Sequence, residues 1–167
     1  MKILAIDPSG NFTEGKGTTG WSLLDENLKI ITCGQKLAIE YTKKEEYWKD
    51  ILALITELKP DILVVEDFLL YASKSNSQIN SRFETPKLIG IIELYAYNRE
   101  IPIYLQRAVD VKNRWTDEIL VNKNIISKVN NRYYASGVMI SEHIRDSIRH
   151  GVHFIKYKLK KGNQNGS

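Results

Sequence analysis

The clearest indication of the fold is Ile62-Leu63-Val64-Val65-Glu66-Asp67, which follows the helix-ending residues Lys59-Pro60-Asp61. Four consecutive apolar residues are typical of a strand that is buried on both faces, as in a parallel sheet covered by helices. Acidic residues are rarely placed at the end of such a strand without a partner. Side chains alternate along a strand, so Glu66 and Asp67 point to opposite faces. We therefore expect a central buried strand that ends in a functional carboxylate, Glu66.

The residues before this stretch predict a three-stranded meander and a helix. Residues 2–7 form a short apolar run that ends in an Asp-Pro turn. Residues 11–19 are rich in Gly, Thr and Lys and predict an exposed loop, and residues 20–24 and 28–36 predict two further strands. Residues 43–58 carry apolar side chains at helical spacing.

The residues after this stretch predict two more helices and another strand. Helices are expected over 86–98, where Pro86 suits the first turn, and over 138–157, with a short strand at 101–105 between them. The order β-β-β-α-β-α-β-α predicts the α/β class, with a mixed five-stranded sheet of three antiparallel strands followed by parallel ones and flanked by helices. We expect one domain over residues 1–157 and a basic, disordered tail over 158–167.

Composition excludes several classes of protein. Hydrophobic residues make up 43% of the chain and charged residues 26%, as in ordinary globular proteins. No apolar run approaches the roughly 20 residues that span a bilayer, so no membrane partner is expected. Cys33 is the only cysteine, which excludes an intrachain disulfide and a cysteine-based zinc site. The expected location is the reducing cytoplasm, that of the bacterial host if a phage encodes the protein.

The net charge of +4 is unevenly distributed. Residues 107–167 contain 12 Lys and Arg against 5 Asp and Glu, whereas residues 1–106 contain 12 against 15. A basic portion joined to a more acidic one is expected of a protein that grips phosphate and concentrates carboxylates elsewhere. A solvated basic tail is the alternative explanation.

Four residues stand where regular elements end or share a face: Asp7, Glu66, His143 and Asp146. If the strands that end at Asp7 and Glu66 are parallel neighbours, both carboxylates emerge at the same edge of the sheet. A helix across that edge would bring His143 and Asp146, three residues apart, to the same point. Taken singly, Asp7 also suits a turn, and the His143–Asp146 pair also suits a solvated helix face.

Clustered carboxylates repel one another, and divalent cations remove that cost. Carboxylate oxygens suit Mg²⁺ or Mn²⁺, and two such ions about 3.5–4 Å apart can activate water and stabilise a leaving 3′-oxygen. We therefore expect two ions per site and phosphodiester hydrolysis.

Three segments resemble the acidic motifs of RuvC-like Holliday-junction resolvases. They are Ile3-Leu4-Ala5-Ile6-Asp7-Pro8 with Thr19-Gly20-Trp21-Ser22, then Pro60-Asp61-Ile62-Leu63-Val64-Val65-Glu66, then His143-Ile144-Arg145-Asp146-Ser147-Ile148-Arg149-His150. Their order and spacing are similar over about 150 residues. The resemblance implies an RNase H-like fold and a homodimer that nicks four-way DNA junctions symmetrically with Mg²⁺ or Mn²⁺. It also implies that Asp7, Glu66, His143 and Asp146 form the catalytic, metal-binding set.

The chain departs from the family pattern at His143, where an Asp is common. Imidazole is a better ligand for Mn²⁺ than for Mg²⁺, so His143 predicts strong support by Mn²⁺. Alternatively, His143 acts as an acid or base, because its ordinary pKa lies near neutrality. The loop over 11–19 is longer than usual, and Asp67-Phe68 after Glu66 is also atypical. Together with the small size, these departures suggest a phage-type member with relaxed sequence preference.

Two groups of residues are expected to contact DNA. Phe68, Tyr71 and Lys74 follow the catalytic Glu66, in the segment that the resemblance assigns to probing the junction, although Phe68 also suits the core. A second, basic stretch is interleaved with aromatic residues, which suits backbone contacts with occasional stacking. Its basic members are Lys112, Arg114, Lys123, Lys128 and Arg132.

The helix expected over 86–97 is apolar on more than one face, and the resemblance makes it the dimer helix. Burial within the monomer is the alternative. Three other functions compete with junction resolution. They are a nuclease of the same fold that acts on RNA–DNA hybrid or flap DNA, an ATPase of the actin and sugar-kinase type, and a non-catalytic protein that binds branched DNA. The chain is short for the two domains of such an ATPase and has no second Gly-rich phosphate loop.

Overall fold

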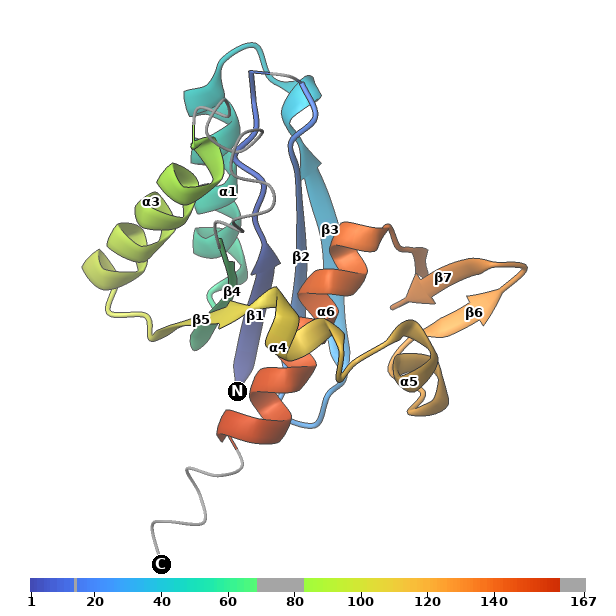
Figure 1. Cartoon of the computed structure of the whole chain (residues 1–167). Helices are drawn as coiled ribbons and strands as arrows, with labels where there is room; N and C mark the ends of the chain where they lie inside the picture. The colour runs from blue at the N-terminus through green and yellow to red at the C-terminus, as the bar shows by residue number, and fades with distance from the viewer. Residues whose placement is uncertain (14, 69–82, 160–167) are drawn as a thin grey trace, which may run out of the picture.

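The computed structural model describes residues 1–13, 15–68 and 83–159, which alternate between strands and helices (Figure 1). The strands of the main sheet are β1 (Lys2–Asp7), β2 (Thr18–Asp25), β3 (Ile30–Leu37), β4 (Ile62–Asp67) and β5 (Ile103–Arg107). The helices that pack around it are α1 (Lys44–Leu58), α3 (Glu84–Asn98), α4 (Ala108–Lys112) and α6 (Glu142–Phe154). A smaller unit follows α4 and comprises α5 (Asp117–Asn122), β6 (Ser127–Val129), β7 (Arg132–Ala135) and β8 (Val138–Met139).

The main sheet has the strand order β3-β2-β1-β4-β5. β1 pairs antiparallel with β2 and β2 with β3, whereas β4 runs parallel to β1 and β5 parallel to β4. Ala5 stands opposite Val64, and Glu66 stands opposite Gln106. The predicted fold class, with three antiparallel strands followed by parallel ones, is therefore confirmed.

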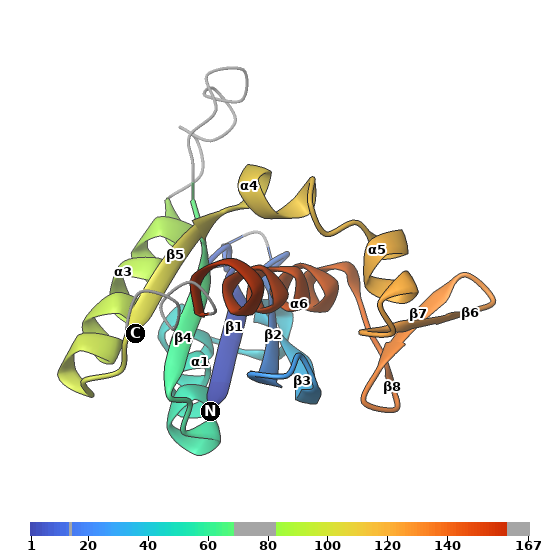
Figure 2. The same cartoon turned by 90° about the horizontal axis from the view of Figure 1, so that it is seen from below.

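Side-chain alternation divides the core between the two faces of the sheet. Ile3, Ala5 and Val64 face α6, while Leu4, Ile6 and Val65 face α1 and α3. All six side chains are fully buried, which explains why β1 and β4 read as continuous apolar runs. Figure 2 shows α6 and the α1–α3 pair on opposite sides of the sheet. Among the described residues, no helix is long and apolar enough to cross a membrane.

The helix predicted over 138–157 starts later than expected. Val138–Met139 is the strand β8, paired with β7, and α6 begins at Glu142, after Ser141, whose hydroxyl accepts a hydrogen bond from the Ile144 amide. Ser136 and Gly137 both have positive φ, the backbone of a two-residue hairpin turn. After Phe154 the backbone widens into a π-helix over Ile155–Leu159. Apolar spacing alone does not distinguish such a hairpin from the first turn of a helix.

The small unit of α5 and β6–β8 was not predicted, and it extends to one side of the main sheet (Figure 1). Asn130 and Asn131, between β6 and β7, also have positive φ and form another two-residue turn. Asparagine tolerates this backbone better than most residues do. The Asn-Asn pair was therefore a hairpin signal inside a segment that otherwise reads as basic and polar.

Candidate active site

Two neighbouring parallel strands deliver the first two carboxylates. Asp7 is the last residue of β1 and Glu66 the next-to-last residue of β4, and the residues just before them, Ile6 and Val65, are paired with each other. By alternation both share the face of Ala5 and Val64, which α6 covers. Glu66, rather than Asp67, therefore points toward α6, as the sequence predicted.

Helix α6 delivers the third carboxylate because it packs unusually close to β2. A Cβ atom at Gly20 would lie 2.2 Å from the backbone carbonyl carbon of His143, so only glycine permits this approach. Gly20 is also the pairing partner of Asp7. One turn further on, the Ser147 hydroxyl donates a hydrogen bond to that of Ser22. The start of α6 is thereby held directly over the end of β1.

The three carboxylates converge. Asp7, Glu66 and Asp146 each offer an oxygen that lies within 4.8 Å of the others, and Asp7 and Asp146 are only 8% and 5% exposed. His143 contacts Asp7 through its Nδ1, 2.9 Å from Oδ2, and lies outside the group of three among the described residues. Of the four residues predicted as the site, the structure brings the three carboxylates together and places His143 in contact with Asp7.

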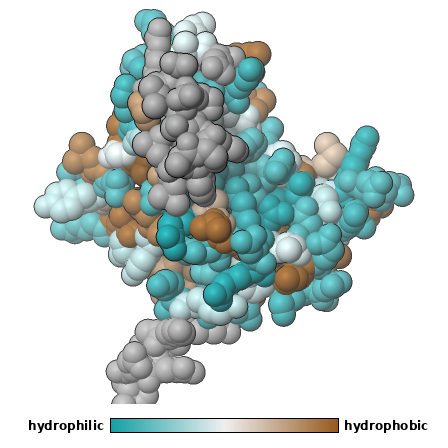
Figure 3. All heavy atoms as spheres, in the orientation of Figure 1, coloured by the Kyte–Doolittle hydropathy of each residue, from teal (hydrophilic) through white to brown (hydrophobic). Residues whose placement is uncertain are grey.

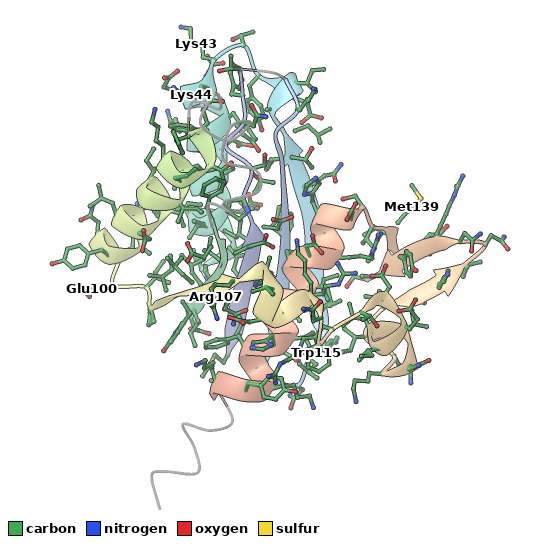
Figure 4. All side chains as sticks on the ribbon, viewed as in Figure 1. Lys43, Lys44, Glu100, Arg107, Trp115 and Met139 are labelled. Carbon is green, nitrogen blue, oxygen red and sulfur yellow. The ribbon has the colours of Figure 1, made fainter. Side chains whose placement is uncertain are left out.

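Lys112 supplies a positive charge between two of the acids. Its ammonium lies 2.8 Å from Oδ2 of Asp146 and 3.4 Å from Oε2 of Glu66. Lys112 ends α4, which packs against α6 (Figure 1). Figure 4 labels Arg107 and Trp115 on either side of this short helix. Lys112 was predicted as a DNA contact, and its placement inside the cluster was missed because no local pattern links it to acids that lie 34 and 46 positions away.

The acids have different protonation tendencies. Burial raises the pKa of Asp7, and the charges of Glu66 and Asp146 raise it further against the opposing hydrogen bond from His143. Burial would also raise the pKa of Glu66, but His150 and Lys112 outweigh it and lower the pKa. Burial opposes the charge on Lys112, yet its hydrogen bond to Asp146 and the nearby acids raise its pKa. The hydrogen bond to Asp7 raises the pKa of His143.

Two further polar residues on α6, which were not predicted as part of the site, contact the acids of the cluster. His150 lies one turn after Asp146 and bridges Glu66 and Gln106. Arg149 forms ion pairs with Asp146 and Asp117 and donates from Nε to the Trp115 carbonyl, at 2.8 Å. Arg149 thereby connects the acid on α6 to the start of α5.

The donor set fits a divalent cation. Hard cations such as Mg²⁺ and Mn²⁺ prefer carboxylate oxygens, and three acids from separate elements converge within one ion's reach. The Lys112 ammonium already occupies a position where positive charge is stabilised by Glu66 and Asp146. Asp7, Glu66 and Asp146 would hold such an ion.

The remaining predicted DNA contacts, where the structure describes them, are not members of this acid cluster. Phe68 is half-buried and packs against the core on the α1–α3 face, while Tyr71 and Lys74 lie outside the described residues. Arg114 is exposed and stacks over Tyr157, with 5.4 Å between guanidinium and ring. Lys123, Lys128 and Arg132 are exposed on the small unit, where the surface over β6 and β7 is mostly hydrophilic (Figure 3).

Comparison with solved structures identifies the same fold in DNA-processing proteins. T. thermophilus RuvC in complex with Holliday junction substrate aligns with a TM-score of 0.67 and 15% identity, covering 96% of each chain. The fowlpox virus Holliday junction resolvase aligns with a TM-score of 0.54 and 15% identity, covering 93% of this chain and 99% of the other. The predicted RNase H-like fold is thereby confirmed. No protein-family model and no curated protein sequence matches the chain.

Proposed function

We propose that the protein is a RuvC-like endodeoxyribonuclease that resolves Holliday junctions by metal-dependent phosphodiester hydrolysis. The observation that carries this proposal is the convergence of Asp7, Glu66 and Asp146 within 4.8 Å. The cluster lies at the carboxyl ends of parallel strands, on a fold that two junction resolvases share across nearly their whole length. Among described residues, these acids are the group suited to hold Mg²⁺ or Mn²⁺, and we propose two ions per site.

The chain's own residues have distinct tasks in this reaction. Bound divalent ions supply polarisation of water and stabilisation of the leaving oxygen. Asp7, Glu66 and Asp146 hold and orient them. Lys112 balances the charge of Glu66 and Asp146 when no metal is bound. The His143 side chain is 45% exposed and touches Asp7, so it can exchange a proton between solvent and the site.

A homodimer would present two such sites to opposite strands of a junction. Helix α3 buries Leu88 and Ile92 against the sheet yet leaves Leu94 and Tyr97 61% and 80% exposed. We propose that this outward apolar face joins two copies, since a twofold axis pairs the same patch on both. The basic residues Arg114, Lys123, Lys128 and Arg132 would then contact the DNA backbone.

The decisive experiment compares substrates and acid variants. Labelled four-way junctions, three-way junctions, duplex DNA and RNA–DNA hybrid are incubated with Mg²⁺, Mn²⁺ or Ca²⁺ and wild-type protein, Asp7→Asn, Glu66→Gln or the control Glu45→Gln. Glu45 is an exposed acid on α1, remote from the cluster in sequence. Symmetric nicks in four-way junctions that only the first two variants abolish would support the proposal. Cleavage of hybrid alone would indicate a different nuclease, and binding without cleavage a non-catalytic junction binder.

A further inference from the structure

A fully buried histidine lies behind the candidate metal ligands. His150 is 0% exposed, and both ring nitrogens have polar partners. Its Nε2 lies 2.9 Å from Oε2 of Glu66, and its Nδ1 lies 3.0 Å from Oε1 of Gln106. Gln106 is the pairing partner of Glu66 on β5, so sheet register places both side chains within reach of one ring on α6. Glu66, His150 and Gln106 thus form a chain of hydrogen bonds.

The proton positions in this chain are constrained. The Gln106 amide nitrogen is buried and has no hydrogen-bond partner among the described residues when the oxygen faces His150. Turning the amide end for end satisfies that nitrogen, because its N–H then donates to Nδ1 of the ring. The neutral ring then carries its single proton on Nε2. If the amide oxygen faces Nδ1 instead, Nδ1 must carry a proton, and Nε2–H donates to Glu66 only when the ring is doubly protonated; with the amide turned, the neutral ring makes the same donation.

Glu66 needs such a restraint more than the two aspartates do. Its side chain has one more rotatable bond than that of Asp7 or Asp146, and a metal ligand works only when its oxygen is held in place. The contact with His150 engages Oε2 and comes from a residue that itself cannot move, because the ring is enclosed and Gln106 orients it. Among the described residues, Oε1 of Glu66 has one distant hydrogen-bond contact, with Lys112 at 3.5 Å, so it is available to a cation.

We propose that His150, oriented by Gln106, is a positioning residue that holds the Glu66 carboxylate for divalent-cation binding. This inference rests on the proposed function, because it assumes that Asp7, Glu66 and Asp146 are metal ligands. It differs from a purely structural role for a buried histidine in one measurable way. Loss of the Nε2–H donor should weaken the binding of Mn²⁺ itself, and removal of such supporting partners typically costs about 10–100-fold in metal affinity.

Two conservative substitutions distinguish the role of Nε2, which faces Glu66, from that of Nδ1, which faces Gln106. In His150→Gln the side-chain amide nitrogen can take the place of Nε2 and still donate to Glu66. In His150→Asn the shorter amide reaches only the position of Nδ1, so contact with Gln106 is kept and contact with Glu66 is lost. His153→Gln is the matched control, because His153 is on the same helix and, among the described residues, contacts the Tyr157 ring and not the three acids.

The test measures Mn²⁺ binding to the DNA-free protein by electron paramagnetic resonance, with melting temperatures recorded in EDTA. We expect His150→Asn to raise the Kd for Mn²⁺ by about 10-fold or more, with His150→Gln within about 3-fold of wild type and His153→Gln unchanged. Wild-type affinity in folded His150→Asn would overturn the proposal, as would equal weakening by both His150 substitutions. If His150→Asn does not fold, Gln106→Met decides, since the proposal requires weaker Mn²⁺ binding there also.

Failure of this inference is distinguishable from failure of the proposed function. If the wild-type protein binds Mn²⁺ and the Asp146→Asn variant does not, the metal centre is established, whatever nucleic acid is cut. The His150 series can then be interpreted even if four-way junctions are not substrates. Wild-type protein that binds no Mn²⁺ would overturn both the metal-dependent function and the positioning role.

Discussion

Charge compensation is the central problem at the level of single residues. Asp7, Glu66 and Asp146 lie close enough for strong mutual repulsion, and each has its own partner: His143, His150 and Arg149 respectively. Lys112 adds a shared ammonium between Glu66 and Asp146. These partners lower the cost of assembling the acids without metal, but a shared ammonium also competes with a divalent cation for the same oxygens.

Replacing Lys112 should therefore have opposite effects on stability and on metal binding. We expect Lys112→Met to lower the free energy of unfolding in EDTA by about 1–3 kcal/mol, and with it the melting temperature, because uncompensated carboxylates remain. The same variant should be stabilised more strongly by Mn²⁺ than wild type, because the competitor is gone. Thermal denaturation over a Mn²⁺ series measures both effects. An unchanged Mn²⁺-dependent shift would mean that Lys112 does not compete for the site.

At the level of elements, the approach of α6 to β2 sets the distance between Asp146 and the strand carboxylates. We expect Gly20→Ala to push the start of α6 away, because the new Cβ would meet the His143 backbone at 2.2 Å. Overpacking of this kind costs about 1–3 kcal/mol. The variant should melt earlier and bind Mn²⁺ more weakly.

Gly90→Ala is the control for that variant. A Cβ at Gly90, inside α3, would meet nothing within 4 Å, so this change should be neutral or stabilise by up to about 1 kcal/mol. Mn²⁺ titration and thermal melting compare the two substitutions. Equal Mn²⁺ affinity in Gly20→Ala and wild type would show that the acids tolerate movement of α6.

The loop after β1 is fastened to the first turn of α3 by one buried carboxylate. Glu84 is 6% exposed and accepts hydrogen bonds from the amides of Phe12 and Thr13 and from the Thr13 hydroxyl. Burial alone would raise the pKa of Glu84, but these hydrogen bonds outweigh burial and lower the pKa below its ordinary value of 4.5.

The stabilisation that the Glu84 carboxylate provides should depend on pH in a defined direction. Because the pKa of Glu84 is lower in the folded than in the unfolded state, its stabilisation is fully present above pH 4.5 and is lost as pH falls through the folded-state pKa. Glu84→Gln should therefore be less stable than wild type at pH 7, by about 2 kcal/mol, with the difference shrinking in acid. Urea denaturation from pH 7 to pH 3 measures this. A difference that stays constant with pH would show that the charge of Glu84 is unimportant.

At the level of the whole molecule, helices cover both faces of the sheet, and one of them, α3, also carries apolar side chains that are exposed to solvent. If this face joins two copies, the double substitution Leu94→Glu and Tyr97→Glu should produce monomers that still bind Mn²⁺ but lose paired nicking of a junction. Analytical ultracentrifugation gives the mass. Ile39→Glu is the control, because Ile39 is a 75% exposed apolar residue on the 3₁₀ helix Ala38–Glu40 that follows β3. A wild-type mass that is already monomeric would contradict the dimer.

The amino-acid sequence determined the main sheet and the three clustered acids. The alternation and apolar runs of residues 2–7 and 62–67 are local features, and a strand-end acid follows directly from them. The small unit after α4 was missed because its hairpins depend on two-residue turns of Asn130-Asn131 and Ser136-Gly137 inside a polar segment. The basic and polar composition of this segment predicted a connector rather than the two hairpins.

The partners of each acid could not be read from the sequence, because they depend on contacts in the folded chain. Lys112, Arg149 and His150 are ordinary cationic or polar residues in sequence, and His150 read as one of several histidines on a helix. Their roles follow from sheet register, which sets Gln106 beside Glu66, and from the glycine contact that lets α6 press onto β2. Apart from the Arg149–Asp146 pair within α6, these contacts join residues 32 to 136 positions apart, and their energy depends on distance in space rather than on neighbours along the chain.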